Sequence, residues 1–385
     1  MKIVFAPDSF KGTLSSLQVI QILERAAKSH FSDLQVVKVP IADGGEGTVE
    51  ALITAMGGEY RYAQVTGPLE GMSVKAMYGV SKNGTAIIEM AQASGLPLLD
   101  ENQRNPLLTT TYGTGELIRV ALDEGIREFI IGIGGSATND GGMGMAQALG
   151  IAFLDGEGRN VGFGGQYLSE VRQIVMDGLD PRIRESKITV ICDVSNPLTG
   201  PQGATYVYGP QKGATKEMLE ILEKGMKNYA GVIQRQMGID MDSIPGAGAA
   251  GGLGAALTGL LGAVLKPGIE AVLEFTDFDS LLDGVNLVVT GEGRIDEQSV
   301  FGKVPVGVAK RCKGKNIPVV AISGIMGKNA GAVYDYGINS IMTTVNRAMP
   351  LEEALTNAEE LLYDAADRMF RLIKTGMDIQ TSIHK

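Results

Sequence analysis

The chain has 385 residues, with 53 Gly, 44 acidic and 34 basic side chains and a formal net charge of −10. The length favours two or three domains, and 44% hydrophobic residues together with aperiodic Gly exclude a disordered chain, collagen and a coiled coil. Two Cys are too few for a disulfide framework or a four-Cys zinc site. Because no uncharged apolar run reaches ~18 residues and basic clusters are lacking, we expect a cytoplasmic protein that binds neither membrane nor nucleic acid.

The N-terminal segment predicts two βα units. Apolar runs indicate strands at residues 3–5 and 34–39, and helical spacing indicates helices at 15–28 and 49–56. Strands that alternate with helices are typical of a parallel sheet covered by helices.

The last hundred residues repeat this pattern. Strands are expected at 287–289, 319–322 and 340–342, followed by a long amphipathic helix from Leu351 to about Ile373. Residues 375–385 lack apolar periodicity and predict a frayed tail.

The middle of the chain has a different pattern. A hairpin is expected between 74–80 and 85–90, through a turn at 82–84, and helices are expected at 114–123 and 216–236. The change in pattern favours an α/β domain formed by both chain ends, with the middle inserted as a second domain.

The residue inventory excludes several kinds of site. The two His, His30 and His384, lie after the first predicted helix and next to the end of the chain, where neither suits a catalytic triad, so we expect both at the surface. With so few His and Cys, carboxylates and carbonyls remain as ligands, and they favour Mg²⁺. No segment matches the Walker phosphate loop.

Two polar loops lead from predicted strands into helices. Residues 7–13 place Lys11 before a helix N-terminus, which predicts either an anion site or an ordinary turn with a solvated Lys. Residues 42–48 carry Asp43 and Glu46 among three Gly, which predicts either a helix cap or a pair of ligands for Mg²⁺ or a hydroxyl group.

The most distinctive loop is GIGGSATNDGGMG at residues 132–144. A buried strand leads into Gly and small hydroxyl residues, so backbone N–H groups can approach a polyphosphate. Gly132, Gly134 and Ala137 also satisfy a loose dinucleotide fingerprint, with Asp155 near the expected acidic position. In that fingerprint a helix begins directly after the last small residue. Here three polar residues and a Gly pair follow Ala137 before the predicted helix, so we favour a phosphate cradle.

Three further loops complete the set. Residues 190–200 place Asp193 at the end of an apolar strand, either to present a carboxylate or simply to form a turn. Residues 245–254 either approach a ligand or allow close helix packing. Residues 289–299, continuing to 305, concentrate charges after a strand, where open α/β sheets place their ligands.

Together these loops resemble the class I glycerate kinase family. The motifs that carry the resemblance are APDSFKG (6–12), ADGGEGT (42–48), GGSATNDGG (134–142), CDVSNPL (192–198) and GEGRID (291–296). They follow the family's order and spacing from about residue 1 to 374. The one departure is Ser195, where the family often has an acidic residue or Asn.

The resemblance implies an ATP-dependent, Mg²⁺-requiring kinase that phosphorylates D-glycerate, usually to 2-phosphoglycerate. It also implies two α/β domains around a cleft that holds the active site. The Rossmann-like domain, with a parallel sheet, would comprise residues 1–66 and 284–374, and residues 67–283 would form the inserted domain. The sequence does not specify an oligomeric state.

On this basis we assign roles to individual residues. Asp193 is the expected base for the substrate hydroxyl, and Lys11 would neutralise the transferred phosphoryl group or the glycerate carboxylate. The expected nucleotide-binding residues are Gly134, Gly135, Ser136, Thr138, Asn139, Asp140 and Gly141. The expected substrate-binding residues are Asp8, Ser9, Lys11, Asn196, Arg294 and Lys303. The candidates for Mg²⁺ are Asp43, Glu46, Glu292 and Asp296.

Two other functions stay open. One is an NAD-dependent oxidoreductase of a small hydroxy acid that uses the fingerprint at Gly132. The other is a non-catalytic protein that binds a nucleotide or a sugar acid.

Overall fold

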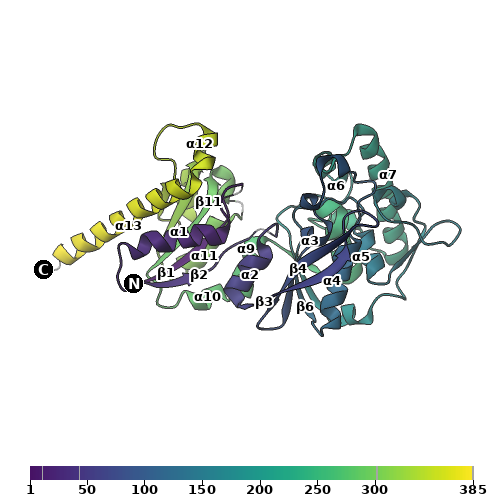
Figure 1. The fold of residues 1–385 in the computed structure, drawn as a ribbon, viewed down its shortest axis with the longest axis horizontal. Coiled ribbons are helices and arrows are strands. Elements are labelled where there is room, and N and C mark those ends of the chain that lie inside the picture. The colour runs from purple at the N-terminus through teal and green to yellow at the C-terminus, as the bar shows by residue number, and fades with distance from the viewer. Residues whose placement is uncertain (11, 43, 301, 384–385) are drawn as a thin grey trace. The chain divides into compact units, whose positions relative to one another are not determined.

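The computed structural model describes residues 1–10, 12–42, 44–300 and 302–383. The chain divides into two compact units, each of which is α/β (Figure 1). Unit 1 comprises residues 1–42, 50–56 and 269–385, and unit 2 comprises residues 43–49 and 57–268. Both ends of the chain therefore belong to one unit, with most of the middle in the other.

Unit 1 contains a five-stranded sheet in the order β13-β12-β11-β1-β2. The strands are β1 (Lys2–Pro7), β2 (Gln35–Lys38), β11 (Leu287–Ile295), β12 (Val319–Met326) and β13 (Ser340–Thr343). All neighbouring strands are parallel. Because β1 pairs with β11, with Phe5 opposite Val289, segments from the two chain ends form one sheet.

The helices that belong with this sheet come from the sequence before and after the middle segment. They are α1 (Ser16–Lys28), α2 (Thr48–Met56), α9 (Gly268–Phe275), α10 (Phe278–Leu281), α11 (Val304–Lys313), α12 (Leu351–Thr356) and α13 (Ala358–Ile383). Short 3₁₀ helices are Glu297–Val300 and Ala330–Tyr336. Helix α1 begins at a capping box in which the Ser15 hydroxyl accepts from Gln18 N and the Gln18 side chain accepts from Ser15 N.

The core of unit 1 lies where α1 and α13 pack together over the sheet. Phe370 of α13 is fully buried, and its ring makes edge contacts with Phe5 of β1 and with Phe31, at centroid distances of 6.3 and 6.2 Å. Beyond the sheet, α13 continues as a projecting helix (Figure 1), and Met377 and Ile379 there are exposed.

The C-terminal helix differs from the sequence prediction in two ways. Asn357 interrupts it and separates α12 from α13. The helix then continues to Ile383, through most of the segment predicted to be a frayed tail from residue 375. The side chains from Lys374 to Ile383 are exposed, so this part of α13 is helical without a core beneath it, and a burial pattern could not reveal it.

His30 also differs from expectation. Its side chain is largely buried and its Nε2 lies 2.7 Å from Asp367 Oδ1 of α13. Together with the hydrogen bond from Arg371, this contact holds the pKa of the Asp367 carboxyl below its usual range. His30 therefore links the end of α1 to α13, whereas His384 lies outside the described residues.

Unit 2 contains a six-stranded mixed sheet in the order β10-β9-β6-β5-β4-β3. The strands are β3 (Gly58–Thr66), β4 (Ser73–Ser81), β5 (Thr85–Glu89), β6 (Glu128–Gly132), β9 (Lys187–Ile191) and β10 (Val264–Lys266). β3, β4 and β5 are antiparallel neighbours, which confirms the predicted hairpin around residues 82–84, and the remaining pairs are parallel. β3 was not predicted from the sequence. It belongs to this sheet, so residues 58–66 lie in unit 2 and not, as predicted, in the domain formed by the chain ends.

The helices of unit 2 pack with this sheet into one large hydrophobic core. They are α3 (Ala91–Ser94), α4 (Tyr112–Asp123), α5 (Met143–Ala148), α6 (Ala204–Tyr208), α7 (Lys216–Met237) and α8 (Leu253–Leu261). Two short strands, β7 (Ala152–Leu154) and β8 (Gln173–Val175), form an antiparallel pair. Short 3₁₀ helices include Pro181–Glu185 and Pro210–Lys212.

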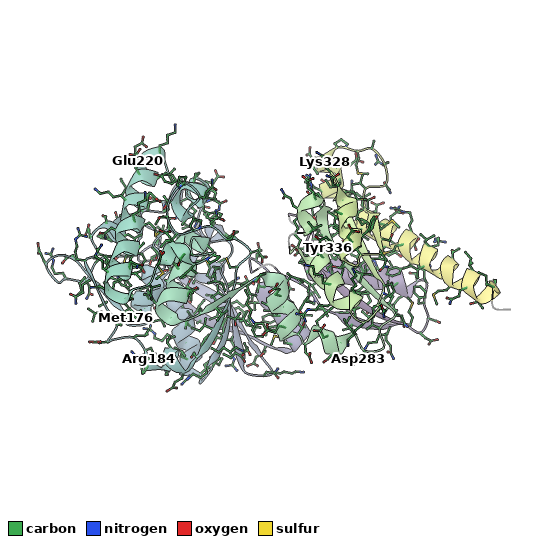
Figure 2. All side chains as sticks on the ribbon, turned by 180° about the vertical axis from the view of Figure 1, so that it is seen from behind. Met176, Arg184, Glu220, Asp283, Lys328 and Tyr336 are labelled. Carbon is green, nitrogen blue, oxygen red and sulfur yellow. The ribbon has the colours of Figure 1, made fainter. Side chains whose placement is uncertain are left out.

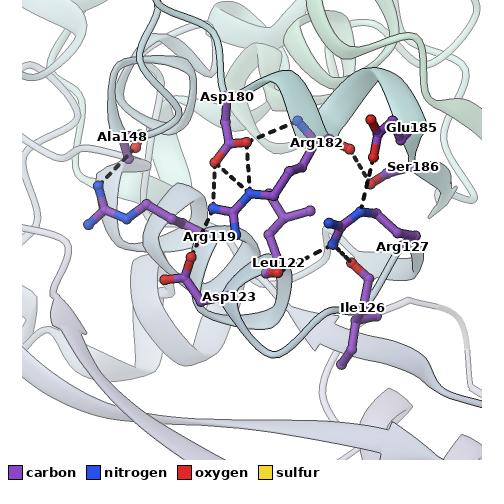
Figure 3. Close-up of polar contacts among 10 residues, drawn as sticks. All are labelled: Arg119, Leu122, Asp123, Ile126, Arg127, Ala148, Asp180, Arg182, Glu185 and Ser186. Atoms are coloured by element: carbon purple, nitrogen blue, oxygen red, sulfur yellow. Dashed lines mark hydrogen bonds and ion pairs between the residues drawn. The ribbon is translucent and has the colours of Figure 1, made fainter.

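An arginine network joins the end of α4 to the segment that precedes β9 (Figure 3). Arg182 contacts both Asp180 and Asp123, at 2.7 and 2.8 Å. Arg127 donates to the carbonyl groups of Leu122 and Ile126. The guanidinium groups of Arg182 and Arg127 are therefore already matched by protein acceptors.

The exposed side chains include both charge signs in each unit, as Figure 2 shows with Arg184 and Glu220 of unit 2 and Asp283 and Lys328 of unit 1. Within the described ranges, every helix is either too short or too polar to cross a bilayer.

Replacing Phe370 by Ala should lower the free energy of unfolding by about 3–5 kcal/mol, because it removes a fully buried ring and leaves a cavity. Urea denaturation followed by far-UV circular dichroism measures the change. Leu372→Ala on the same helix is the control, since that side chain is 67% exposed and its loss should cost less than about 0.5 kcal/mol. Equal effects of the two changes would contradict the placement of Phe370 in the core.

Candidate active site

Three chemically distinctive segments of unit 2 meet at one edge of its sheet. The parallel register places Glu89, at the end of β5, opposite Gly132 of β6, and Gly132 opposite Ile191 of β9. The Gly-rich loop follows Gly132 directly, and the Asp193 loop follows Ile191. Carboxyl ends of parallel strands are where open α/β sheets bind ligands, so this edge is the candidate site of unit 2.

A second predicted loop lies against the Gly-rich loop. Gly134 N donates to Gly44 O at 2.9 Å. A Cβ atom at Gly134 would lie 2.7 Å from Gly45 Cα, and one at Gly132 would lie 2.6 Å from Gly44 O. Two backbone segments therefore pass at a distance that requires Gly, and the structure brings the loops at 44–48 and 132–144 together.

The Gly-rich loop has an exposed tip and a buried base. Gly135 is exposed and has φ +74°, a conformation that favours Gly, whereas residues 136–140 are buried. The loop is tied down by Ala137 N, which donates to Ser94 O, and by Leu96 N, which donates to Gly135 O. Among the described residues, the N–H groups of Gly135 and Ser136 have no protein acceptor, so they are available to an anion.

The buried base is organised by the carboxylate of Asp140, which is fully buried. It accepts hydrogen bonds from Thr111 N, Thr111 Oγ1, Gly142 N and Gly144 N, at 2.7 to 3.3 Å. The Thr111 hydroxyl accepts from Met145 N, so its own hydrogen points to Asp140. Burial raises the pKa of Asp140 and these donors oppose that shift; because all four are donors, we assign the ionised form.

Two neighbouring side chains that we expected at the nucleotide also face the protein. Asn139 is fully buried and its Nδ2 donates to Thr205 Oγ1 of α6 at 3.1 Å. Thr138 is fully buried, and its carbonyl oxygen accepts from Lys212 Nζ at 2.6 Å. The sequence predicts phosphate contacts through backbone N–H groups of this loop, and the side chains of Thr138, Asn139 and Asp140 are buried beneath it.

The glycine-rich segment at residues 245–254 packs against this base. Gly141 N donates to Gly251 O at 2.9 Å. A Cβ atom at Gly251 would lie 2.0 Å from Thr138 O. The sequence offered approach to a ligand or close helix packing for this segment, whereas the structure shows close backbone contact with the Gly-rich loop.

Glu89 and Lys212 are polar residues of this region that the sequence analysis missed. The Glu89 carboxylate is buried and accepts from Val49 N at 2.8 Å, which fixes the loop that carries Glu46. Burial raises the pKa of Glu89, and the charge of Glu46 acts in the same direction. A charged residue that ends an apolar strand was the signal that identified Asp193, and it also applies to Glu89. No comparable signal marks Lys212.

Asp193 lies in the exposed part of the loop after β9. Its Oδ1 accepts from Gly268 N at 2.7 Å, which holds the carboxylate in place. Asn196, expected to bind substrate, uses both ends of its amide within the protein: its Oδ1 accepts from Tyr208 OH and its Nδ2 donates to Gln202 O. Asn196 therefore shapes the loop in this conformation.

In unit 1, the segment predicted as a loop from Val289 is largely strand. β11 continues to Ile295 because it pairs with β12 as far as Met326. The sequence from Thr290 to Arg294 is polar and contains Gly, so it lacks the apolar pattern from which a strand is predicted. Asp8 N donates to Gly291 O at 2.8 Å and Ser9 N to Asp8 Oδ1 at 2.6 Å, so the end of β1 lies beside the Glu292 motif.

Acids and bases are concentrated around β11. Ser299 Oγ donates to Glu292 Oε1 at 2.8 Å, and Lys303 Nζ lies 3.7 Å from Glu292 Oε2. Burial, together with the nearby charge of Asp296, raises the pKa of Glu292. Burial also acts on Asp296, but the N–H of Gln298 and the charges of Lys303 and Arg294 outweigh it and lower the pKa of Asp296. Arg294 Nε contacts Asp296 Oδ2 at 2.8 Å.

Hard carboxylate oxygens in this pair fit Mg²⁺, which in kinases uses one or two protein carboxylates in addition to phosphate oxygens. Across residues 1–10, 12–42, 44–300 and 302–383, no group of three or more potential ligands among His, Cys, Asp and Glu converges on one point. Glu46 is exposed in its loop. Lys11 and Asp43, predicted to contact the substrate and the metal, lie outside the described residues.

The dinucleotide alternative finds no support in this geometry. Helix α5 begins only at Met143, after the whole polar segment. Asp155, near the acidic position of the fingerprint, is bound within its own turn by Glu157 N and by Arg159. It is not presented to the loop.

Comparisons with known proteins agree on one family. A model described as the glycerate kinase family matches residues 3–374. A glycerate kinase of Bacillus subtilis (strain 168) is 50% identical over 384 residues, covering 100% of this chain and 98% of the relative. The glycerate 2-kinase of Escherichia coli (strain K12) is 48% identical over 378 residues, covering 98% and 99% of the two chains.

A solved structure is similar in fold as well as in sequence. It is a crystal structure from Salmonella typhimurium LT2 of a protein provisionally assigned as glycerate kinase 2. The TM-score is 0.85 at 46% identity, with 98% of this chain and 99% of the other covered.

Asp140→Asn should lower the free energy of unfolding by about 3 kcal/mol or more, because an amide NH₂ would face N–H donors and a buried charge would be lost from the loop base. Chemical denaturation of the two proteins gives the difference. Asp177→Asn, an exposed acid of the same unit, is the control and should change stability by less than about 0.5 kcal/mol. If Asp140→Asn were as stable as the control, the carboxylate would not organise the loop.

Proposed function

This chain belongs to the glycerate kinase family, and from that premise we propose that it transfers the γ-phosphoryl group of ATP to D-glycerate. The expected product is 2-phosphoglycerate, in keeping with the name of the E. coli relative. The observation that carries the proposal is the turn at Gly135 and Ser136: Gly135 is exposed, and the N–H groups of both residues have no acceptor among the described residues.

Phosphate binding at this turn fits the electrostatics of the chain. The protein is acidic overall, so an anionic nucleotide needs local positive potential. Backbone N–H groups in a tight glycine turn supply it without a Walker loop. The proposed phosphate contacts are therefore the backbone N–H groups of Gly135 and Ser136. The N–H groups of Gly134 and Gly141 donate to Gly44 O and Gly251 O and hold the loop in place.

Mg²⁺ is the proposed metal, with Glu292 and Asp296 as the residues that would hold it. When bound, it would neutralise phosphate charge during transfer. Lys303 and Arg294, which lie beside these carboxylates, would bind the anionic groups of the substrates. Asp8 and Ser9, next to Gly291, remain candidates for the substrate hydroxyl groups, and so does Lys11 for its carboxylate.

The proposed step is an in-line displacement with Asp193 as base. The glycerate hydroxyl oxygen forms a bond to the γ-phosphorus, and the bond from that phosphorus to the β,γ-bridging oxygen breaks to release ADP. The hydroxyl proton passes to the Asp193 carboxylate. Exposure of Asp193 permits contact with a substrate, and its hydrogen bond from Gly268 N orients it.

The two free Cys, Cys192 and Cys312, are consistent with a reducing compartment, and we place the enzyme in the cytoplasm. The oxidoreductase is the weaker alternative, since the acid of its fingerprint is committed to another turn.

A coupled assay of ADP release tests the proposal. ATP consumption should require D-glycerate, should yield phosphate on the 2-hydroxyl by ³¹P NMR, and should stop when EDTA removes divalent metal. Reduction of NAD⁺ without ATP turnover would identify an oxidoreductase. Binding of ATP or glycerate without ADP release would identify a non-catalytic protein.

Asp193→Asn should reduce kcat at least ~10²-fold, the usual contribution of a general base, while the affinity for ADP stays within about twofold. Steady-state kinetics and calorimetric titration with ADP measure these two quantities. Asp242→Asn, which alters the same loop through Thr199, controls for indirect effects on loop shape. Near-normal turnover in Asp193→Asn would remove Asp193 from the role of base.

A further inference from the structure

A lysine ammonium group is buried directly beneath the proposed phosphate turn. Lys212 closes the 3₁₀ helix Pro210–Lys212 and is only 1% exposed. Its Nζ donates to Ser136 Oγ at 2.8 Å and to Thr138 O at 2.6 Å. A single side chain, distant in sequence, thus holds both the hydroxyl and the backbone of the loop.

The segment that carries Lys212 is itself fixed to the loop at a second point. Thr205 of α6 accepts from Asn139 Nδ2, three residues beyond Ser136. Lys212 N donates to Gly209 O, and Gly213 ends the turn with φ +89°. The backbone of Lys212 is therefore anchored beside the loop, and its buried side chain places the ammonium group at Ser136.

Burial of an ammonium group is costly unless its charge is matched. Burial lowers the pKa of Lys212 to about 7, and the charge of Asp140 acts in the opposite direction. Among the described residues, the charge that raises the pKa of Lys212 is that of Asp140. Since four donors favour ionised Asp140, the base of the loop contains one negative and one positive charge, which balance each other.

We propose that Lys212 is the positioning residue of the phosphate turn. Its bonds to Ser136 and Thr138 hold the backbone in the conformation that leaves the N–H groups of Gly135 and Ser136 to a nucleotide phosphate. Its positive charge, lying behind these N–H groups, strengthens phosphate binding. The inference rests on the proposed function, because it takes this turn to be the nucleotide site.

A specific pH dependence follows. Because burial lowers the pKa of Lys212 to about 7, the charged fraction of its side chain falls as the pH rises through this value. The attraction for phosphate therefore weakens as the pH rises through this value, and the affinity for ADP should fall over the range from about pH 6 to 8. ADP titrates identically in all samples, so a comparison between wild type and a Lys212 variant isolates the contribution of the protein.

The test uses Lys212→Met, which keeps the length of the side chain and removes its charge and donors. Calorimetric titration with ADP and Mg²⁺, together with steady-state kinetics, should show Kd for ADP and KM for ATP raised at least about tenfold. KM for D-glycerate and kcat should change less than threefold, and the fall in affinity with pH should disappear. Lys216→Met, an exposed lysine on α7, is the matched control and should behave as wild type.

Ser136→Ala is the second variant, since it removes one acceptor of Lys212 and leaves the charge in place. It should raise Kd for ADP severalfold, and the double variant should be less impaired than the sum of the two changes, because the two residues share one interaction. Ser136→Ala keeps the test open should Lys212→Met fail to fold.

The outcomes separate the inference from the proposed function. If wild-type protein phosphorylates D-glycerate but folded Lys212→Met and Ser136→Ala bind ADP normally with an unchanged pH profile, the role of Lys212 is overturned. If Ser136→Ala binds ADP normally when Lys212→Met does not fold, the role is also overturned. If wild-type protein has no ATP-dependent activity on glycerate, the proposed function fails, and the inference fails with it.

Discussion

The candidate site depends on the hydrogen bonds that the fully buried carboxylate of Asp140 accepts. Thr111 and the first turn of α5 supply its donors, so the helix start and the Gly-rich loop have one shared anchor. A buried negative charge is tolerated only where donors and a counter-charge meet it, and Lys212 provides the counter-charge. The buried polar side chains of the loop, Thr138, Asn139 and Asp140, therefore support it from below. The N–H groups of Gly135 and Ser136 at the turn are the ones that we propose for phosphate.

This arrangement explains how an acidic protein without a Walker loop can hold a polyphosphate. Affinity comes from N–H groups at an exposed tip, and rigidity comes from the base below it. The glycines at 132, 134 and 251 are required for a different reason, since other backbone segments pass within Cβ distance of them. The high glycine content therefore reflects close backbone packing around one loop as well as the anion site itself.

The fold class and much of the element order could be predicted from the sequence. Periodicity located β1, α1 and the β4–β5 hairpin, and the prediction that both chain ends form one α/β domain is confirmed by the pairing of β1 with β11. Membership of the glycerate kinase family is confirmed as well.

The length of β11 and the end of α13 were mispredicted, because Gly-rich strands and exposed helices lack an apolar pattern. The roles of the candidate site residues stay predictions. Sequence cannot say whether Asn139 or Asp140 faces solvent, and Lys212 lies too far along the chain to be linked with Ser136.

The most direct test is a crystal structure of the protein with a non-hydrolysable ATP analogue, Mg²⁺ and D-glycerate. Phosphate oxygens should lie within about 3 Å of the nitrogen atoms of Gly135 and Ser136, with the Lys212 contacts to Ser136 and Thr138 retained. Phosphates bound elsewhere, with these two N–H groups left to water, would contradict the account.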